Sequence, residues 1–266
     1  REGPRNKIPQ ADLILEQTIY TTNSAPVLQP IRRHNSNNHN SVAKPLKVLH
    51  VVDSMRQGGM ENGVCNLANH LAPEQFNTHI CCLRDGGAIG ARLKRPSQLY
   101  ELKKAPGLSF SCVKHLRDVI LLLQPDILHT HNLGPLLYSS LALKLCKKKK
   151  LLHGEHAELA ASDLVFRRKL IRKYLYRECD AVHSVSAQLT TNLRQHGFHH
   201  RNLHTIPNGV DTDKFYPAQQ KSIAKKQLKI AHVTGESFLV GSVGRFGPYL
   251  KWSGLFINVN KKEGIV

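Results

Sequence analysis

The sequence has no apolar run long enough to cross a membrane. A spanning helix needs roughly 20 predominantly apolar residues, and the most apolar stretch, VILLLQPDILH, is interrupted by Gln124, Pro125 and Asp126. The opening segment, REGPRNKIPQ, has no apolar core of the kind that secretory leaders contain. We therefore expect a cytoplasmic protein.

Cysteine motifs are also missing. The six cysteines form no C-x-x-C pair, and several of them lie in apolar segments, where a free thiol behaves as a small hydrophobe. They are Cys65, Cys81, Cys82, Cys112, Cys146 and Cys179. This pattern predicts reduced core residues, and we expect neither a metal ion nor an organic cofactor.

Acidic residues are scarce. The chain has 19 Asp and Glu residues against 38 Lys and Arg residues, which gives a formal net charge of +19. Such a balance favours anionic lipid surfaces, nucleic acid or phosphorylated ligands as partners, although a solvated basic surface has the same composition. Basic and aromatic residues are not interleaved and no nucleic-acid motif is present, so we expect no specific nucleic-acid partner.

Apolar strands and helices alternate through the middle of the chain. Buried strands are expected at 45–53, 76–83, 126–131, 150–156, 180–186 and 202–207, and helices at 59–72, 114–124, 135–148, 163–179 and 187–197, the last ended by Gly197. The alternation predicts an α/β fold with a doubly wound parallel sheet. Ligands of such sheets bind beyond the carboxyl ends of the strands.

The flanking segments differ from this domain, which we place at 45–217. Residues 1–44 are polar and include RRHNSNNHNS, so we expect them to be mostly disordered. Residues 218–236 read as a basic linker. A new buried strand at 237–246 predicts a second α/β domain, of which 237–266 would be a truncated start, too short to bury a core.

Two glycines, Gly58 and Gly59, lie between the first strand and the first helix. A turn without Cβ atoms lets backbone N–H groups approach a phosphate at a helix N-terminus. The segment QGGMEN is neither G-x-G-x-x-G nor a Walker loop, so alone it favours a tight turn. Apolar residues of the following helix are expected to pack in the core: Val64, Leu67, Ala68 and Leu71.

Histidines follow two neighbouring strands. In HTHNLG, we expect His129 and His131 to point to opposite faces, one packed inside and the other facing the cleft. From this segment alone, two structural histidines are an equally good interpretation. The segment HGEHAE carries His153 and Glu155 and is not the H-E-x-x-H of zinc proteases. A second polar cluster at a strand end favours a role in the cleft for at least one of its residues.

Two basic segments have alternative interpretations. Arg245 and Lys251 flank a Gly/Pro turn in GRFGPYLK, where two cations could neutralise a diphosphate; an ordinary basic loop is the alternative. The helix FRRKLIRKYLYR mixes apolar and basic residues. It could lie on an anionic membrane, but packing of its apolar side on the sheet is the favoured expectation.

Together these segments resemble family 4 glycosyltransferases, which have the GT-B architecture of two Rossmann-like domains. The resemblance runs from about Lys47 to Lys251 through KVLHVVDSMRQGGMENGVCNLANHL, PDILHTHN, CDAVHSVSAQLTTNL and VGSVGRFGPYLK. The most specific segment is IPNGVDTDKFYP, which is similar to the family's interdomain connector. GGMENG with HGEH is similar to sugar transferases of exopolysaccharide gene clusters.

The resemblance implies roles by position. Gly58 and Gly59 would approach the donor diphosphate or the acceptor, His131 would be catalytic near the transferred sugar, and Arg245 and Lys251 would bind the diphosphate. His153 and Glu155 are further candidates for substrate contact. The implied reaction moves a sugar, with retention and without a metal, from a UDP- or GDP-linked donor to a glycan or lipid-linked acceptor. It would occur in the cytoplasm or at the inner membrane face.

The sequence departs from the family in its second domain. The family's pair of glutamates eight residues apart and its pocket for the nucleotide base have no counterpart here, and the match degrades after Lys251. We therefore expect this chain alone to be inactive or a poor catalyst. A non-catalytic module for anionic lipid or nucleic acid, and a fragment of a GT-B-type sugar epimerase, remain alternatives.

Overall fold

The structure is a computed structural model that describes residues 44–146 and 149–217, with a few isolated positions beyond. Two short strands among the latter, β8 (Phe238–Leu239) and β9 (Asn258–Val259), pair antiparallel. Residues 1–43, most of the predicted linker and nearly all of the predicted second domain lie outside the described residues. The predicted domain boundaries therefore stay predictions.

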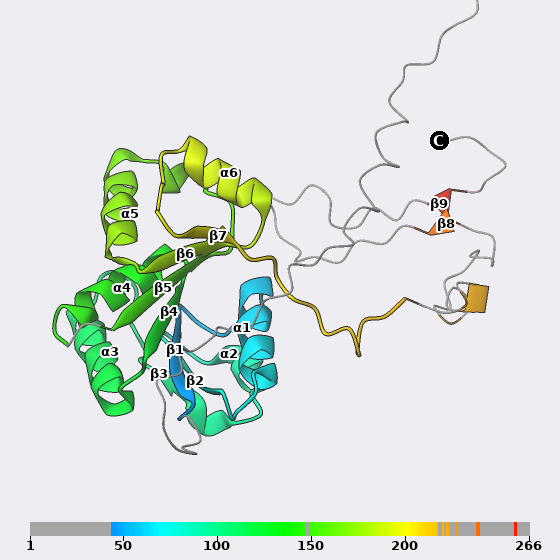
Figure 1. Ribbon diagram of the computed structural model, residues 1–266, viewed down its shortest axis with the longest axis horizontal. Coiled ribbons are helices and arrows are strands. Elements are labelled where there is room, and N and C mark those ends of the chain that lie inside the picture. Colours follow the sequence, from blue (N-terminus) through cyan, green and yellow to red (C-terminus); the bar gives the residue numbers. More distant parts are fainter. Residues whose placement is uncertain are drawn as a thin grey trace, which may run out of the picture. The chain divides into compact units, whose positions relative to one another are not determined.

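Seven parallel strands form the sheet at the centre of the described domain (Figure 1). They are β1 (Leu46–Val52), β2 (Phe76–Cys82), β3 (Leu99–Glu101), β4 (Ile127–His131), β5 (Lys150–Glu155), β6 (Ala181–Ser184) and β7 (Leu203–Thr205). Their order across the sheet is β3-β2-β1-β4-β5-β6-β7, and every neighbouring pair is parallel. The predicted doubly wound α/β fold is confirmed.

Helices cover both faces of this sheet. They are α1 (Gly59–His70), α2 (Gly87–Gly90), α3 (Phe110–Leu123), α4 (Leu133–Leu143), α5 (Phe166–Glu178) and α6 (Ala187–Gln195). In Figure 1, α1 and α2 lie on one side of the sheet and α3, α4 and α5 on the other. The chain changes direction across the sheet between β1 and β4, and in doubly wound folds this switch point is where ligands bind.

Two details of the helices have local causes. Helix α3 begins four residues before its predicted start because Ser109 caps it, with Oγ accepting a hydrogen bond from the Cys112 N–H at 3.2 Å. The predicted stop after α6 is confirmed: Gly197 has a φ of +76°, and Phe198 N–H donates to the Leu193 carbonyl at 2.9 Å.

The core divides between the two faces of the sheet. One cluster, which includes Leu49, Leu128 and Leu175, lies under the helices after β3, and the other, which includes Val52 and Ile80, lies under α1 and α2. All six cysteines are free, and five of them are buried, as predicted for reduced core residues. Within the described part of the chain, no helix combines the length and apolar character needed to span a bilayer.

Candidate functional site: a histidine-floored cavity at the switch point

A cavity of about 670 Å³ opens on the α1 face of the sheet. Its floor consists of sheet side chains from β1, β4, β5 and β6, its first wall is α1, and its second wall is the segment 206–213, which contains the NGVD motif. β1 and β4 are the two strands that flank the switch point. The cavity therefore lies at the position that the fold favours for a ligand.

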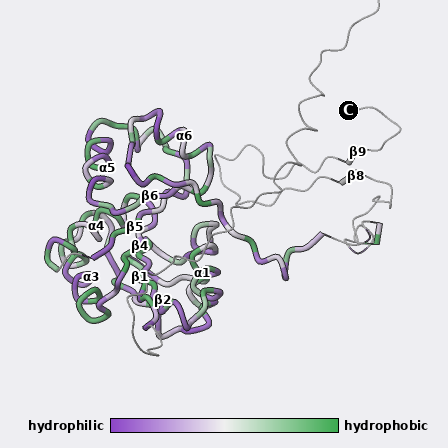
Figure 2. The backbone as a smooth tube through the Cα atoms, in the orientation of Figure 1, coloured by the Kyte–Doolittle hydropathy of each residue, from purple (hydrophilic) through white to green (hydrophobic). Residues whose placement is uncertain are grey.

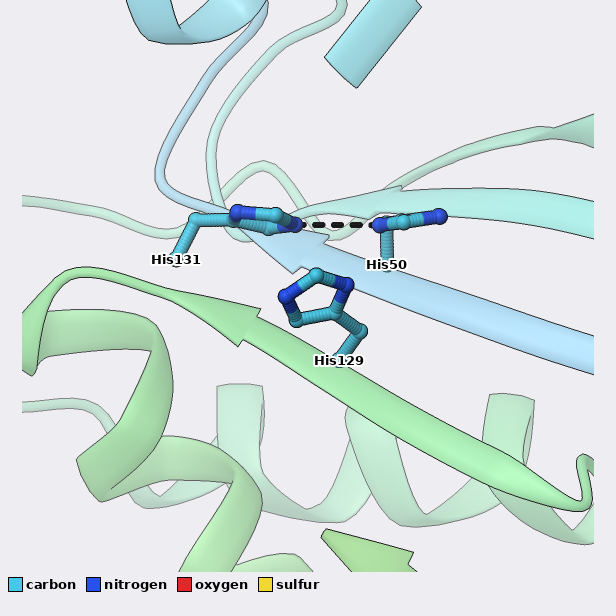
Figure 3. Close-up of side chains that lie close together, drawn as sticks. All are labelled: His50, His129 and His131. Atoms are coloured by element: carbon cyan, nitrogen blue, oxygen red, sulfur yellow. Dashed lines mark hydrogen bonds between the residues drawn. The ribbon is translucent and has the colours of Figure 1, made fainter. Parts of the chain in front are cut away.

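Histidines form the polar part of the floor. His50 on β1 is directly opposite His129 on β4, and His131 follows two residues later on the same face (Figure 3). The expectation that His129 and His131 point to opposite faces is wrong, because side chains alternate along a strand and residues two apart share a face. Both residues line the cavity, together with His156 and His183.

The histidine rings contact one another. His50 Nδ1 lies 3.0 Å from His131 Nε2, and His131 Nδ1 lies 2.8 Å from His156 Nε2. His129 Nε2 lies 2.9 Å from His183 Nε2. Gly154 leaves room for these contacts, since a Cβ there would lie 2.6 Å from His183 Nε2 and 2.8 Å from His156 Nε2.

Burial keeps the cluster uncharged. Desolvation, reinforced by the neighbouring imidazoles, lowers the pKa of His50, His156 and His183 to about 4. The same causes lower the pKa of His129 and His131 well below the ordinary value. Near neutral pH, the floor therefore offers uncharged imidazoles, which can donate or accept hydrogen bonds or bind a metal ion.

The two walls meet across the mouth of the cavity. His70 Nε2 of α1 lies 3.8 Å from an Asp211 carboxylate oxygen, and a Cβ on Gly63 would lie 4.0 Å from Asn208 Oδ1. The prediction that Leu67 packs in the core is wrong: its side chain is 41% exposed and lines the cavity with Leu71. The Asn208–Asp211 motif and one apolar side of α1 thus belong to the same site.

The glycine pair lies at the start of α1, outside the set of cavity-lining residues. Gly58 is the residue before the helix, and a Cβ there would meet the Glu61 carboxylate. A Cβ on Gly59 would meet nothing within 4 Å. Open space beside Gly59 agrees with the predicted approach of a ligand, which stays a prediction.

His153 and Glu155 face the other side of the sheet. His153 Nε2 lies 3.2 Å from Glu155 Oε1, and the same oxygen accepts a hydrogen bond from Tyr176 at 2.8 Å and lies 3.2 Å from Arg172 Nε. All four residues are buried, and neither His153 nor Glu155 lines the cavity. Their placement favours a structural role over the substrate contact that we expected.

Opposing effects act on the Glu155 carboxyl group. Burial alone raises its pKa, but the hydrogen bond from His153 and the charge of Arg172 outweigh burial, and the pKa is lowered. Burial and the adjacent Glu155 carboxylate raise the pKa of Tyr176, so its hydroxyl stays a hydrogen-bond donor. The group is a charged network enclosed beneath α5.

Two predicted site residues lie outside the described part of the chain, and two histidines of the floor were not predicted. Arg245 and Lys251 lie outside the described residues. His50 and His183 were not among the predicted site residues. The signal was present in KVLHVVD and DAVHSVS, where a histidine interrupts an otherwise apolar strand and so marks a polar position on a buried face.

Comparison with known proteins assigns the family. The sequence matches the family model described as Glycosyltransferase Family 4 over residues 57–214. No curated protein matches the sequence significantly.

Two solved structures are similar to the described domain. HepE of Anabaena, in complex with UDP-glucose, is 18% identical with a TM-score of 0.57, over 70% of this chain and 50% of that one. A glycosyltransferase of Rickettsia africae is 20% identical with a TM-score of 0.53, over 72% and 52%. The chain thus spans about half the length of the structures that it resembles. Their likeness supports the GT-B half-fold, and because the family model matches more than half of the chain, this protein belongs to glycosyltransferase family 4.

Proposed function

We propose that this chain forms the acceptor-side half of a retaining glycosyltransferase. The reaction moves a sugar from a UDP- or GDP-linked donor to a glycan or lipid-linked acceptor in polysaccharide biosynthesis. The match to glycosyltransferase family 4 over residues 57–214 carries this proposal. That span includes α1, four of the five floor histidines and the NGVD segment, all of which line the cavity; His50, on β1, precedes it.

The nucleotide-sugar donor is supported by a relative. HepE binds UDP-glucose and UDP in its solved structures. In this chain, the turn at Gly58 and Gly59 follows β1 at the carboxyl edge of the sheet, where helix N-termini favour a phosphate. His131, as an uncharged imidazole on the floor, is the residue that we propose contacts the transferred sugar.

Turnover tests this proposal. Release of UDP or GDP is measured from a panel of nucleotide sugars, with and without a polar lipid extract as acceptor, for this chain and for any longer product of its gene. We expect the longer product to release nucleotide only with both substrates present. His131→Ala should remove that release, whereas His204→Ala, at an exposed position on β7, should not.

Acceptor binding by this chain distinguishes the outcomes. The acceptor-side half should bind the lipid-linked acceptor without turning over the donor. Full turnover by the 266-residue chain would contradict the division into two halves. A failure of both products to bind acceptor or release nucleotide would contradict glycosyl transfer.

We also propose that α5 rests on an anionic membrane at the cytoplasmic face. Phe166, Leu170 and Tyr174 recur every four residues and are 75%, 51% and 48% exposed, on the side away from the buried Arg172 and Leu175. Basic residues lie among them: Arg167, Arg168, Lys169, Lys173 and Arg177. Figure 2 shows hydrophobic and hydrophilic residues interspersed along α5.

Exposed apolar side chains flanked by cations fit the interface of a bilayer that contains anionic lipid. The expectation that the apolar side of this helix packs on the sheet is confirmed for Leu175, which is buried. It is wrong for Val165, Leu170 and Ile171, which are exposed. Sedimentation with vesicles measures the binding. Vesicles with anionic lipid should retain the protein and neutral vesicles should not, and Phe166→Ser with Leu170→Ser should abolish retention. Val210→Ser, which changes an exposed apolar residue of the connector, is the control; equal retention by both vesicle types would contradict the proposal.

A further inference from the structure

Five imidazoles meet on the cavity floor without a carboxylate among them. They belong to His50, His129, His131, His156 and His183, and the hydrogen bonds among them join ring to ring. The nearest buried carboxylate described above, that of Glu155, lies on the opposite face of the sheet. Such a group of uncharged nitrogen donors requires a physical explanation beyond packing.

Some of these nitrogens have no hydrogen-bond partner. Among the described residues, His50 Nε2, His156 Nδ1 and His183 Nδ1 are buried and make no hydrogen bond. Buried polar atoms are nearly always paired, and an exception points to a bound water or ion. Three of the five residues also converge: His50, His129 and His131 each offer one ring nitrogen, and these nitrogens lie within 4.8 Å of one another (Figure 3).

The spacing suits a tetrahedral metal ion. A zinc–imidazole bond of about 2.0–2.1 Å separates two nitrogen ligands by about 3.3 Å. His50 Nδ1 and His131 Nε2 are 3.0 Å apart, so a small outward rotation of the rings admits an ion between them. His129 lies beside this pair, directly opposite His50 in the strand register.

We propose that His50, His129 and His131 bind a transition-metal ion of the zinc class, with a fourth position open to the cavity. Imidazole nitrogens suit zinc, copper and nickel rather than magnesium or calcium. Three protein ligands with an open position leave room for water or an oxygen ligand from the cavity. This inference departs from our expectation of no metal. With the ion bound, the open metal position and not the His131 ring would face the sugar, and the tests below measure the ion and not glycosyl transfer.

Outer contacts support the three ligands. The ring nitrogens that would not face the ion are held by neighbours, since His131 Nδ1 lies 2.8 Å from His156 and His129 Nε2 lies 2.9 Å from His183. Metal-bound histidines usually have such a partner, which fixes the ring orientation.

Negative charge is also available at the cavity wall. Asp211 and Asp213 line the same cavity, and carboxylates near the mouth offset the positive charge of a bound ion. Acidic residues are scarce in this chain, which carries a formal net charge of +19, so two carboxylates on one cavity wall are a local exception to its basic character. The cavity thus combines neutral ligands on its floor with anionic groups on its wall.

Zinc binding by the full chain, produced without a histidine tag and stripped with a chelator, tests the site. Titration calorimetry with Zn²⁺ should show one site that is lost in His50→Gln, His129→Gln and His131→Gln. His156→Gln and His183→Gln should weaken it by about 10–100-fold, as expected for outer partners. His204→Gln, which removes an exposed imidazole on β7, should leave the site unchanged.

Spectroscopy on the unsubstituted protein covers the case in which a variant fails to fold. Zinc-edge X-ray absorption of the one-to-one complex should show three imidazole nitrogens at about 2.0 Å. Absence of binding by the unsubstituted chain, binding retained in all three ligand variants, or a zinc ion held by thiolates would overturn the proposal. Because these readouts measure the ion and not turnover, they are independent of the transferase assay.

Discussion

Replacing Glu155 by glutamine removes a negative charge that several buried side chains face. Glu155 Oε1 lies 2.8 Å from the Tyr176 hydroxyl and 3.2 Å from both His153 Nε2 and Arg172 Nε. After the substitution, Asp163, at 3.7 Å, is the acidic partner that Arg172 keeps within the described domain. The guanidinium group, only 3% exposed, then keeps only this longer ion pair, and Asp163 also pairs with Arg168 at 3.1 Å.

The expected cost follows from that burial. Removing one partner of a buried ion pair costs about 3–5 kcal/mol, because the other charge stays desolvated and unpaired. In a domain of this size, each kcal/mol corresponds to about 2–4 °C in Tm. Glu155→Gln should therefore lower the Tm by about 6–20 °C. Replacing both partners should cost less than the sum of the single changes, since Glu155→Gln with Arg172→Met leaves no buried charge unpaired.

Urea denaturation followed by circular dichroism measures the two single variants and the double variant. The lowered pKa of Glu155 adds a pH test. A carboxyl group whose folded pKa is depressed stabilises the fold above its unfolded pKa, and this contribution is lost as pH falls through the folded pKa. The deficit of Glu155→Gln should thus shrink in acid. A deficit below about 1 kcal/mol at neutral pH, or strict additivity in the double variant, would refute the buried ion pair.

Two further predictions concern the histidine floor. Gly154→Ala should cost about 1–3 kcal/mol of unfolding free energy, because its Cβ would lie under 3.0 Å from His156 and His183, whereas Gly59→Ala, with open space around the new Cβ, should be nearly neutral; equal effects in urea denaturation would contradict the crowding. In chelator-treated protein, stability should fall as pH drops from about 6.5 towards 4. The unfolded chain takes up protons there, while the pKa of about 4 keeps His50, His156 and His183 uncharged in the fold. A flat profile between pH 7 and 5, measured by thermal unfolding, would contradict this assignment.

The long elements of the fold were predictable from the sequence, and the short ones were not. β1 and β2 are seven residues long; β1 is apolar except at Lys47 and His50, and β2 ends in the buried apolar run Ile80–Cys82, as is typical of strands buried on both faces. β3 has three residues and α2 has four, which is too few for a hydrophobic period to be recognised. The sequence pattern therefore predicted no helix or strand between residues 83 and 114.

The helical spacing of apolar residues identified the apolar sides of α1 and α5, but not which of these residues the sheet buries. Leu67 continues the stripe of α1 from Val64, yet it is 41% exposed because the helix extends over a cavity. The apolar residues of α5 similarly divide between two sides, with Leu175 buried and Leu170 exposed. Spacing within a helix fixes which residues share a side, whereas contact with the sheet depends on where the helix crosses it.

The histidine floor shows why the site itself was only partly predictable. Each histidine could be assigned to a strand, and the correct use of the two-residue period would have put His129 and His131 on one face. That His50 joins them depends on β1 and β4 being neighbours, although β2 and β3 come between them in the chain. Alternating strands and helices are compatible with several strand orders, so the convergence follows from the sheet order and not from any local pattern. In a doubly wound sheet with this order, a polar residue inside β1 has to be considered together with polar residues of β4, because their side chains meet at the switch point.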